Sequence, residues 1–381
     1  MTSATPFMYS SFGAVHRPHH TSYRAAIIGA GRIGSLLERD ALRAKPCTHA
    51  GTYAAHPGVE LVAGADLDAQ RLAQFGADWR IPSAHLYSDY HELLERERPD
   101  LVSICAYAPD RIEMARAAIE AGARGLWLEK AVACSMAEAV SLRGLATAAG
   151  VAVVVNHTRR ADPAWRRVAD AVAGAELGRL ESVHCLFSGH FLHTGTHAWD
   201  LLDEWCGPWV SVQCWPEPQG KDARGRTADA RARSALPSAA ADVHADEDPG
   251  GVAHIRFANG VHAFVSGSPK RYFIFQCDLV FTAGRIQIGN DVRRVYRPAP
   301  SPRYEGFIEL EETGESLTGA AQPSLLDALL EGMETGHARL DSLDAAIRAL
   351  NLGLAVIRAS ATPGYAISPL DLPVDFHVSS I

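Results

Sequence analysis

A glycine-rich turn near the start of the chain constrains the fold more than any other feature. The apolar run from Arg24 to Ala30 leads into Gly29-Ala30-Gly31-Arg32-Ile33-Gly34, and residues with helical character follow as far as Leu42. At this spacing the first glycine permits a tight bend, the second lets backbone approach a pyrophosphate, and the third allows close packing of helix on strand. Because the match follows a predicted strand and opens a predicted helix, it predicts a dinucleotide-binding βαβ unit.

Predicted strands and helices alternate from this turn to Asn156. Apolar runs predict strands at 59–65, 100–106, 125–128 and 151–155. Helices are expected between them, at 69–74, from a cap at Ser88 to Glu97, at 111–121, and from the Ser135 and Glu138 capping box to Ala149. The alternation predicts an α/β fold with an N-terminal Rossmann domain, built on a doubly wound parallel sheet.

The second half of the chain has a different pattern. One helix opens at Asp162-Pro163, and segments with a period of two follow. Strands at 253–257 and 261–265 flank Asn259-Gly260, a strong hairpin signal, and a meander is expected to continue through 278–282, 285–288 and 292–297. With closing helices at 324–334 and 343–359, this predicts a C-terminal α+β domain on an open, mainly antiparallel sheet.

These patterns divide the chain into regions. We expect a loose N-terminal arm at 1–22, a dinucleotide-binding domain at 23–156, and a substrate-binding and oligomerisation domain at 157–381. Residues 216–250 are rich in Pro, Ala, Arg and Asp without a period, which predicts a mobile loop. The open sheet favours a homodimer or homotetramer.

Composition narrows the partners and the compartment. The net charge of −8 comes without a long basic block, so neither nucleic acid nor an anionic membrane is an expected partner. The longest apolar runs, such as 151–155, fall far short of the roughly 18 residues of a membrane helix, and no leader pattern opens the chain. Seven scattered cysteines without a Cys-x-x-Cys pair predict a cytoplasmic protein without a disulfide framework.

An acidic residue at the end of the second strand bears on the cofactor. Asp66 can accept both ribose hydroxyls of a dinucleotide, which favours NAD, and Arg71 keeps NADP possible. Asp66 stands 32 residues after Gly34, where about 20 is usual. The excess predicts an insertion at 36–47, after the first turn of the helix.

Three further motifs follow in order: Glu129-Lys130-Ala131, the segment from Asn156 to Pro163, and Gly195-Thr196-His197-Ala198-Trp199-Asp200. Together with the glycine turn and Asp66, they resemble the Gfo/Idh/MocA family, the oxidoreductases grouped around glucose-fructose oxidoreductase, inositol dehydrogenase and MocA. The likeness runs from Tyr23 to Leu372. Two positions depart from the family pattern, because Ala131 replaces a proline and His193 replaces an aspartate found in many members.

The resemblance implies the roles of the site residues. It puts Lys130 and His197 beside the nicotinamide, where they hold and deprotonate a hydroxyl of a sugar or cyclitol, and His193 beside the substrate. It implies cofactor contacts from the glycine turn (Gly29, Gly31, Arg32, Ile33 and Gly34) and from Asp66, Arg71 and Glu129. Asp200 is expected to orient a neighbouring group on the substrate side. By their own chemistry, Arg159 and Arg160 either anchor a substrate carboxylate or phosphate or form a solvated approach to the helix, and the sequence leaves both open.

The chemistry of the residues agrees with those roles. Removal of hydride from a secondary alcohol leaves a carbonyl only if the hydroxyl proton also departs, and an imidazole that titrates near 6.5 is suited to accept it. A buried lysine shares that task or donates a hydrogen bond to the developing oxyanion. The sequence therefore predicts an NAD(P)-dependent oxidoreductase that acts on a CH–OH group of a sugar, cyclitol or sugar conjugate.

Three alternatives stay open from the sequence. His184, His190, His193 and His197 could form a zinc site, although no metal is the preferred expectation. A tightly bound NAD could oxidise a sugar transiently, to allow elimination, epimerisation or glycoside cleavage. A chain that binds dinucleotide without catalysis could instead regulate a partner.

Overall fold

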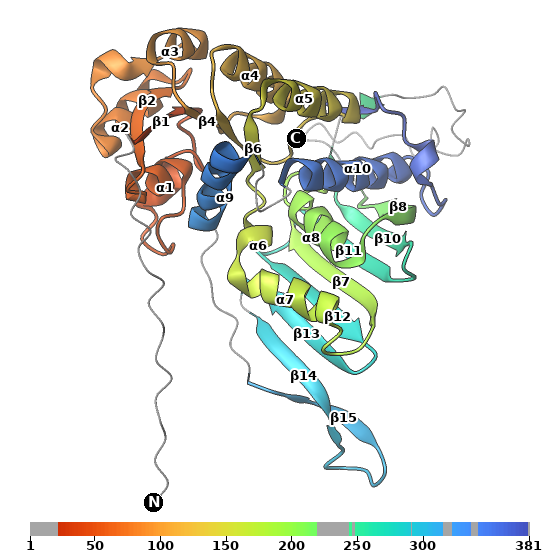
Figure 1. The fold of residues 1–381 in the computed structure, drawn as a ribbon. Coiled ribbons are helices and arrows are strands. Elements are labelled where there is room, and N and C mark those ends of the chain that lie inside the picture. The colour runs from red at the N-terminus through yellow and green to blue at the C-terminus, as the bar shows by residue number, and fades with distance from the viewer. Residues whose placement is uncertain are drawn as a thin grey trace, which may run out of the picture.

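The computed structural model describes residues 22–218, 244–245, 248–290, 292–314, 322–336 and 342–379 (Figure 1). Residues 1–21 of the expected arm, and residues 219–243, 246 and 247 of the expected loop, lie outside these ranges. Within the ranges, no helix has both the length and the apolar character needed to cross a bilayer.

The first half of the chain forms a six-stranded parallel sheet with the order β3-β2-β1-β4-β5-β6. Its strands are β1 (Tyr23–Ile28), β2 (Val59–Ala65), β3 (Leu86–Tyr87), β4 (Leu101–Ile104), β5 (Gly125–Leu128) and β6 (Ala152–Val155). The helices between them are α1 (His49–Ala55), α2 (Ala69–Trp79), α3 (Tyr90–Glu97), α4 (Ala108–Glu120) and α5 (Met136–Ala149). The order reverses between β1 and β4, which is the switch point where doubly wound sheets bind ligands, and the predicted Rossmann fold is confirmed.

The helix after the glycine turn differs from the prediction. Only the short 3-10 turn Leu36–Arg39 forms there, and α1 begins at His49. The backbone amides of His49 and Ala50 donate to the carbonyls of Ile33 and Gly34, so α1 resumes the helical turn across the inserted residues. The Glu38 carboxylate closes the insertion by accepting from the Cys47 amide and the Thr48 hydroxyl.

The N-cap of α3 also differs. Asp89, rather than Ser88, accepts the backbone amide of His91. The predicted cap of α5 is present, because the Ser135 hydroxyl accepts the Glu138 amide. A short 3-10 turn at Ser83–His85 precedes β3.

The second half forms an eight-stranded sheet with the order β15-β14-β13-β12-β7-β11-β10-β8. Its strands are β7 (Leu180–Ser188), β8 (Trp209–Pro216), β10 (Gly251–Phe257), β11 (His262–Ser268), β12 (Phe275–Phe281), β13 (Gly284–Gly289), β14 (Arg293–Pro300) and β15 (Ile308–Glu312). The predicted β10–β11 hairpin forms. The prediction of an uninterrupted meander was wrong, because β7 lies between β11 and β12 and runs parallel to β11. The sheet is therefore mainly antiparallel with one parallel pair.

Helices cover one face of this sheet (Figure 1). They are α7 (Pro163–Gly174), α8 (Thr196–Cys206) and α10 (Ser342–Ser360), joined by the short α6 (Thr158–Ala161) at the junction with the first sheet. Helix α9 (Gln322–Thr335) returns to the first sheet and packs on β5 and β6. Strand β9 (His244–Ala245) pairs in parallel with β16 (His377–Val378), which follows a 3-10 turn at Pro369–Asp371.

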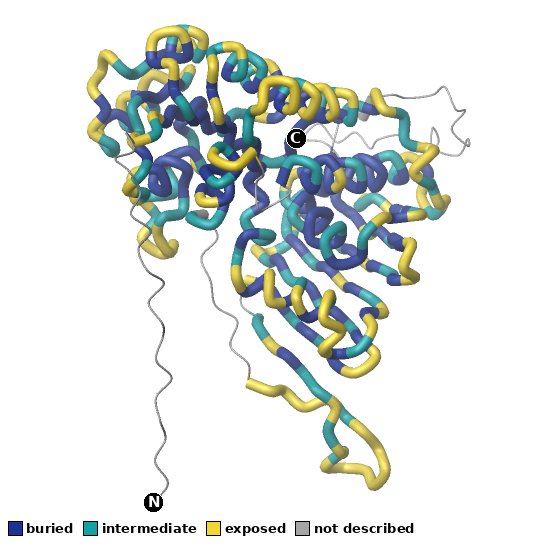
Figure 2. The backbone as a smooth tube through the Cα atoms, viewed as in Figure 1, coloured by how far each residue is buried: buried dark blue, intermediate teal, exposed yellow. Residues whose placement is uncertain are grey.

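Exposed apolar side chains also lie on strands of the eight-stranded sheet. Figure 2 shows how buried and exposed residues are distributed along the chain. Trp215, Val252 and Phe264 are 44%, 48% and 43% exposed, and the His184 ring stacks on Phe264. Apolar surface of this kind often marks an interface. Assembly into a homodimer or homotetramer stays a prediction.

Candidate functional site

The glycine turn at the end of β1 is packed tightly on one side and open on the other. Gly29 has φ +94°, and a Cβ on Gly34 would lie 2.2 Å from the Gly29 carbonyl oxygen. A Cβ on Gly29 would lie 3.0 Å from the Ala106 amide nitrogen, whereas nothing lies within 4 Å of a Cβ on Gly31. The first and third glycines thus allow close packing and the second faces free space, which fits a pyrophosphate against the turn. Arg32 is exposed beside it.

Asp66 joins the end of β2 to this turn. Its Oδ2 accepts the Ala30 amide at 2.8 Å, and its Oδ1 accepts the Asp68 amide at 2.9 Å. Arg71 Nε lies 3.1 Å from the same carboxylate. The Asp66 side chain is 7% exposed and that of Arg71 is 39% exposed, so a cation reaches solvent beside the residue expected to hold a ribose.

Glu129, at the end of β5, belongs to a buried polar network that we call the Glu129 network (Glu129, His49, Ser103, Tyr53 and Asn156). Glu129 Oε1 accepts from Asn156 Nδ2 and lies 3.3 Å from His49 Nε2. His49 Nδ1 lies 2.9 Å from the Ser103 hydroxyl, which donates to Tyr53.

The network keeps Glu129 ionised. Burial acts to raise the pKa of Glu129, but His49 and then Lys130 outweigh it and hold the pKa below its ordinary value. Glu129 was expected to touch the cofactor, and in the structure its oxygens are taken by neighbours and by the Lys130 amide. Sequence reasoning missed His49 and gave Asn156 a place in a motif but no role; the two lie 80 and 27 residues from Glu129 along the chain.

Lys130 extends from the same strand end toward the second sheet. Its Nζ donates to the His193 carbonyl at 2.8 Å, and the peptide that follows it, Lys130–Ala131, is cis. Burial lowers the pKa of Lys130, and the Glu129 carboxylate partly offsets that effect. Arg111, which the sequence did not single out, donates to the carbonyls of Ala131 and Ala106 and so supports the Lys130 segment from α4.

The segment that carries His193 is held from the other side by Asp248. The Asp248 Oδ2 accepts the amides of Leu192 and His193 at 2.8 and 3.0 Å, while its Oδ1 is buried without a hydrogen-bond partner. Burial raises the pKa of Asp248 to about 6. This residue lies in the range expected to be a mobile loop, and the Asp248-Pro249-Gly250 turn signal just before β10 is what could have drawn attention to it.

Four basic groups converge here, and we call them the basic cluster (Lys130, Arg159, His193 and His197). The Lys130 charge and then burial lower the pKa of His193 to about 4. Burial and then the Arg159 and Lys130 charges hold the pKa of His197 well below its ordinary value. The titration near 6.5 expected for these imidazoles is therefore corrected downward, and both rings are neutral at physiological pH. The Nδ1 of His197 is buried without a hydrogen-bond partner.

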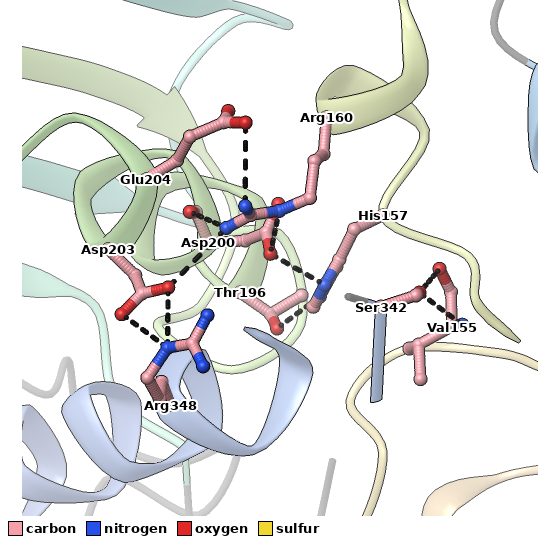
Figure 3. Close-up of polar contacts among 9 residues, drawn as sticks. All are labelled: Val155, His157, Arg160, Thr196, Asp200, Asp203, Glu204, Ser342 and Arg348. Atoms are coloured by element: carbon pink, nitrogen blue, oxygen red, sulfur yellow. Dashed lines mark hydrogen bonds and ion pairs between the residues drawn. The ribbon is translucent and has the colours of Figure 1, made fainter. Parts of the chain in front are cut away.

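Asp200 lies one turn from His197 and forms the centre of a second buried group, the Asp200 hub (Figure 3). Its Oδ1 accepts from Arg160 Nε at 2.9 Å and from His157 Nδ1 at 3.2 Å. Arg160 also lies 3.5 Å from both Asp203 and Glu204. The hub members are Asp200, His157, Arg160, Thr196, Asp203, Glu204 and Arg348.

The hub changes the interpretation of two predicted substrate contacts. The side chains of Asp200 and Arg160 are 1% and 13% exposed and point at each other. Burial acts to raise the pKa of Asp200, but His157 and Arg160 outweigh it and the pKa lies below its ordinary value. Asp200 and Arg160 thus form a buried ion pair that links α8 to α6, and their expected role on the substrate side stays a prediction.

The geometry bears on the zinc alternative as well. His184 stacks on Phe264 with ring centroids 5.1 Å apart, and the same Phe264 ring stacks on His254 rather than on His190, His193 or His197. Among the residues that the structure describes, three potential ligand atoms come within 4.8 Å of one another at Cys134, Glu138 and His377 instead. Burial raises the pKa of Cys134 to about 12, so this thiol stays protonated.

Comparison with known proteins agrees with this geometry. Residues 23–157 match the model of the GFO_IDH_MocA family, described as an oxidoreductase family with an NAD-binding Rossmann fold. The chain is 28% identical to the uncharacterized oxidoreductase YrbE of Bacillus subtilis over 152 residues, and this aligned stretch covers 40% of each chain. It is 31% identical over 121 residues to D-apiose dehydrogenase of Paraburkholderia graminis, covering 32% of each. The matched stretch thus spans less than half of these relatives.

A solved structure extends the likeness to the second half. The WlbA dehydrogenase of Bordetella pertussis, crystallised with NADH and UDP-GlcNAcA, is 18% identical to this chain, with a TM-score of 0.68 over 91% of this chain and 99% of that one. At this identity the likeness concerns the fold, which includes the eight-stranded sheet. The resemblance drawn from the motifs is thus confirmed for residues 23–157, the stretch that matches the model of the GFO_IDH_MocA oxidoreductase family.

Proposed function

We propose that this chain is an NAD(P)-dependent oxidoreductase that transfers a hydride between a nicotinamide and a secondary hydroxyl of a sugar, cyclitol or sugar conjugate. One observation carries the proposal: Lys130, at the carboxyl end of β5, meets the segment that carries His193 and His197, so basic groups from both halves of the chain converge at the switch-point side of the first sheet. A relative named D-apiose dehydrogenase, and a structural neighbour with a bound nucleotide sugar, support the substrate class.

The nicotinamide, when bound, supplies the hydride acceptor or donor. The glycine turn and Asp66 hold its pyrophosphate and ribose in this proposal, which leaves Lys130 and His197 for the substrate. His197 is neutral at physiological pH and accepts the hydroxyl proton, while Lys130 donates a hydrogen bond to the same oxygen. Asp248 and the Lys130 amine fix the backbone of His193 from two sides, and this orients the ring that contacts the substrate.

Two other functions fit parts of this geometry. A nicotinamide that stays bound and is reduced and reoxidised within one turnover would use the same Lys130 and His197 for a redox-neutral reaction. A regulator that only binds dinucleotide would have no use for the depressed pKa values of these two groups, because perturbed pKa values cluster where protons move. The enzyme is therefore the function that we favour.

The test is a screen of sugars, polyols and glycosides with NAD and NADP, in which nicotinamide absorbance and product mass are followed together. Reduced nicotinamide formed in proportion to oxidised product supports the dehydrogenase. A mass change without net reduction supports the redox-neutral version. Tight dinucleotide binding with neither change would overturn both and leave the regulator.

A further inference from the structure

Two neighbouring arginines of α6 differ in their partners. Arg160 faces three carboxylates in the Asp200 hub. Arg159 points to the other side, where its guanidinium has no hydrogen bond or ion pair with any residue that the structure describes. Burial lowers the pKa of Arg159 to about 10, which leaves it charged at physiological pH. The Asp162 carboxylate acts on this charge from a distance but accepts the Ala164 amide and forms no ion pair with Arg159. A half-buried cation without a direct ion pair is costly, and an anionic ligand would offset that cost.

The surroundings of Arg159 fix which part of it is available. Its guanidinium carbon lies 3.7 Å from the centroid of the Phe275 ring, so one flat face is covered. The His197 ring meets the same Phe275 ring at 6.3 Å, edge to face, and the Arg159 charge acts on both His197 and Lys130. The N–H groups at the edge of the guanidinium remain, and this edge matches two oxygens of one planar anion.

The charge balance around the site favours an anion. Lys130, Arg159 and Arg111 are cations of this region, and none of the three has an ion pair within the described ranges. The Glu129 carboxylate already contacts His49 and Asn156. Asp248 has a pKa raised to about 6, so its negative charge forms less readily than that of an ordinary aspartate. Protonation of His197 during turnover would add a further positive charge next to Arg159.

We propose that Arg159 is a specificity-determining residue that binds an anionic substituent of the substrate, a carboxylate or a phosphate, beside the carbon that His197 and Lys130 act on. The inference rests on the proposed function and narrows its substrate class from sugars in general to acidic or phosphorylated sugars. The anion on Arg159 also cancels the charge that disfavours the imidazolium of His197, so the correct substrate improves its own proton acceptor. In the proposed function the glycine turn holds the cofactor phosphates, which leaves Arg159 for the substrate.

The test compares matched sugars that differ only at one group, in the presence of NAD. The pairs are D-glucose with D-glucuronate, D-galactose with D-galacturonate, and D-glucose with D-glucose 6-phosphate. Binding is measured by calorimetry and turnover by nicotinamide reduction, in the unaltered protein and in Arg159→Gln, Arg159→Lys and Arg167→Gln. Arg167 is exposed on α7, so Arg167→Gln is a control with the same change of net charge.

The acid of at least one pair should bind about 10- to 100-fold more tightly than its neutral partner, which is the range for a charge-assisted contact. Arg159→Gln should abolish this preference, Arg159→Lys should keep part of it, and Arg167→Gln should keep all of it. The carboxylate and phosphate pairs show which anion is bound. If no pair shows a preference, or the preference survives Arg159→Gln, the inference is overturned.

Two results separate the inference from the proposed function. Equal oxidation of acidic and neutral sugars would overturn the role of Arg159 and leave the dehydrogenase standing. Binding of an acid that depends on Arg159, without any reduction of nicotinamide, would overturn the dehydrogenase and leave the anion site. If Arg159→Gln fails to fold, the His197 ring can be titrated by NMR in the unaltered protein: its pKa should rise when D-glucuronate or D-glucose 6-phosphate is added, and an unchanged pKa would count against the proposal.

Discussion

The Asp200 hub and the basic cluster lie side by side and are built from neighbouring residues of the same segments. His157 and Arg160 face the hub, whereas Arg159, between them in the chain, faces the cluster. In the hub each arginine meets at least one carboxylate. In the cluster, Lys130 and Arg159 have no ion pair within the described residues, and the Lys130 amine bonds to a carbonyl instead.

The difference separates stability from function. Removing one partner of a buried ion pair leaves an uncompensated charge, so changes in the hub should act on folding. In the cluster, the charges are already uncompensated in the folded state. Its members therefore contribute little to stability and are available to a ligand. Changes in the cluster should therefore act on turnover and binding at nearly constant stability.

The largest effect is expected at His197. His197→Ala should lower turnover by about a hundredfold or more, because a positioned proton acceptor contributes about 10²- to 10⁴-fold. Nicotinamide binding should be kept, since in the proposed function the glycine turn and Asp66 hold the dinucleotide, and the melting temperature should change little. Lys130→Met should behave likewise. Stopped-flow turnover, cofactor titration and thermal melts measure the three quantities, and full turnover in His197→Ala would remove the ring from the mechanism.

The hub should show the opposite response. Asp200→Asn should destabilise the protein by about 3 kcal/mol, because Arg160 and His157 lose their shared carboxylate in a buried setting. The folded-state pKa of Asp200 lies below the ordinary value of 3.8 for an aspartate. The difference in unfolding free energy between the variant and the unaltered protein should therefore be fully present at neutral pH, and it should shrink only as the pH falls below 3.8. Urea denaturation measures it, with Asp170→Asn on the exposed side of α7 as the control. Equal stability of the two variants would contradict a structural hub.

Asp248 tests the contrast from the acidic side. It is a buried carboxylate with one oxygen unpaired and a raised pKa of about 6, so ionisation above that pH costs stability and the cost is relieved as the pH falls toward 3.8. Asp248→Asn removes the titration. The difference in unfolding free energy between the variant and the unaltered protein should therefore shift by about 2 kcal/mol in favour of the unaltered protein between pH 7 and pH 4. A difference that is constant with pH would show that Asp248 titrates normally.

The elements with strong local signals could be predicted from the sequence. Strands 59–65 and 125–128 form with the predicted bounds. The second is a continuous apolar run between turn residues, which fits a strand that is buried on both faces. The β10–β11 hairpin follows from Asn259-Gly260 for a similar local reason. The place of β7 between β11 and β12 depends on pairing between segments about 80 residues apart, which no local pattern carries.

The site shows the same limit. Motifs identified Lys130 and His197, but the partners that set their charge states come from distant segments: Arg159 lies 38 residues before His197, and Asp248 lies 55 residues after His193. The sequence could not tell which arginine of the Arg159-Arg160 pair is neutralised, because adjacent residues of a helical turn point in different directions. The insertion at 36–47 was found from spacing alone, whereas its closure by Glu38 was not.

A smaller effect is expected at Asp66. Its carboxylate forms an ion pair with Arg71, like the residues of the hub, and it also stands at the expected ribose position, like the ligand-facing residues of the cluster. Asp66→Ala should narrow a preference for NAD over NADP by about tenfold, through the removal of a charge that opposes a 2′-phosphate. Arg71→Ala should widen the same preference. Dissociation constants of the two oxidised cofactors measure it, and tighter binding of NADP than of NAD to the unaltered protein would contradict the assignment of Asp66.

The smallest effect is expected at His193, the most exposed member of the basic cluster. If its ring orients the substrate without taking the proton, His193→Ala should raise KM several-fold and lower kcat by less, as loss of uniform binding predicts. The pKa of about 4 keeps the ring neutral between pH 5 and pH 8, so the KM ratio of variant to unaltered protein should be constant over that range. Asp248 and Lys130 hold the backbone of this residue, and the loop should therefore keep its shape without the ring. If His193→Ala abolished turnover and His197→Ala did not, the proton would belong to His193, and the contrast between the two histidines would have to be reversed.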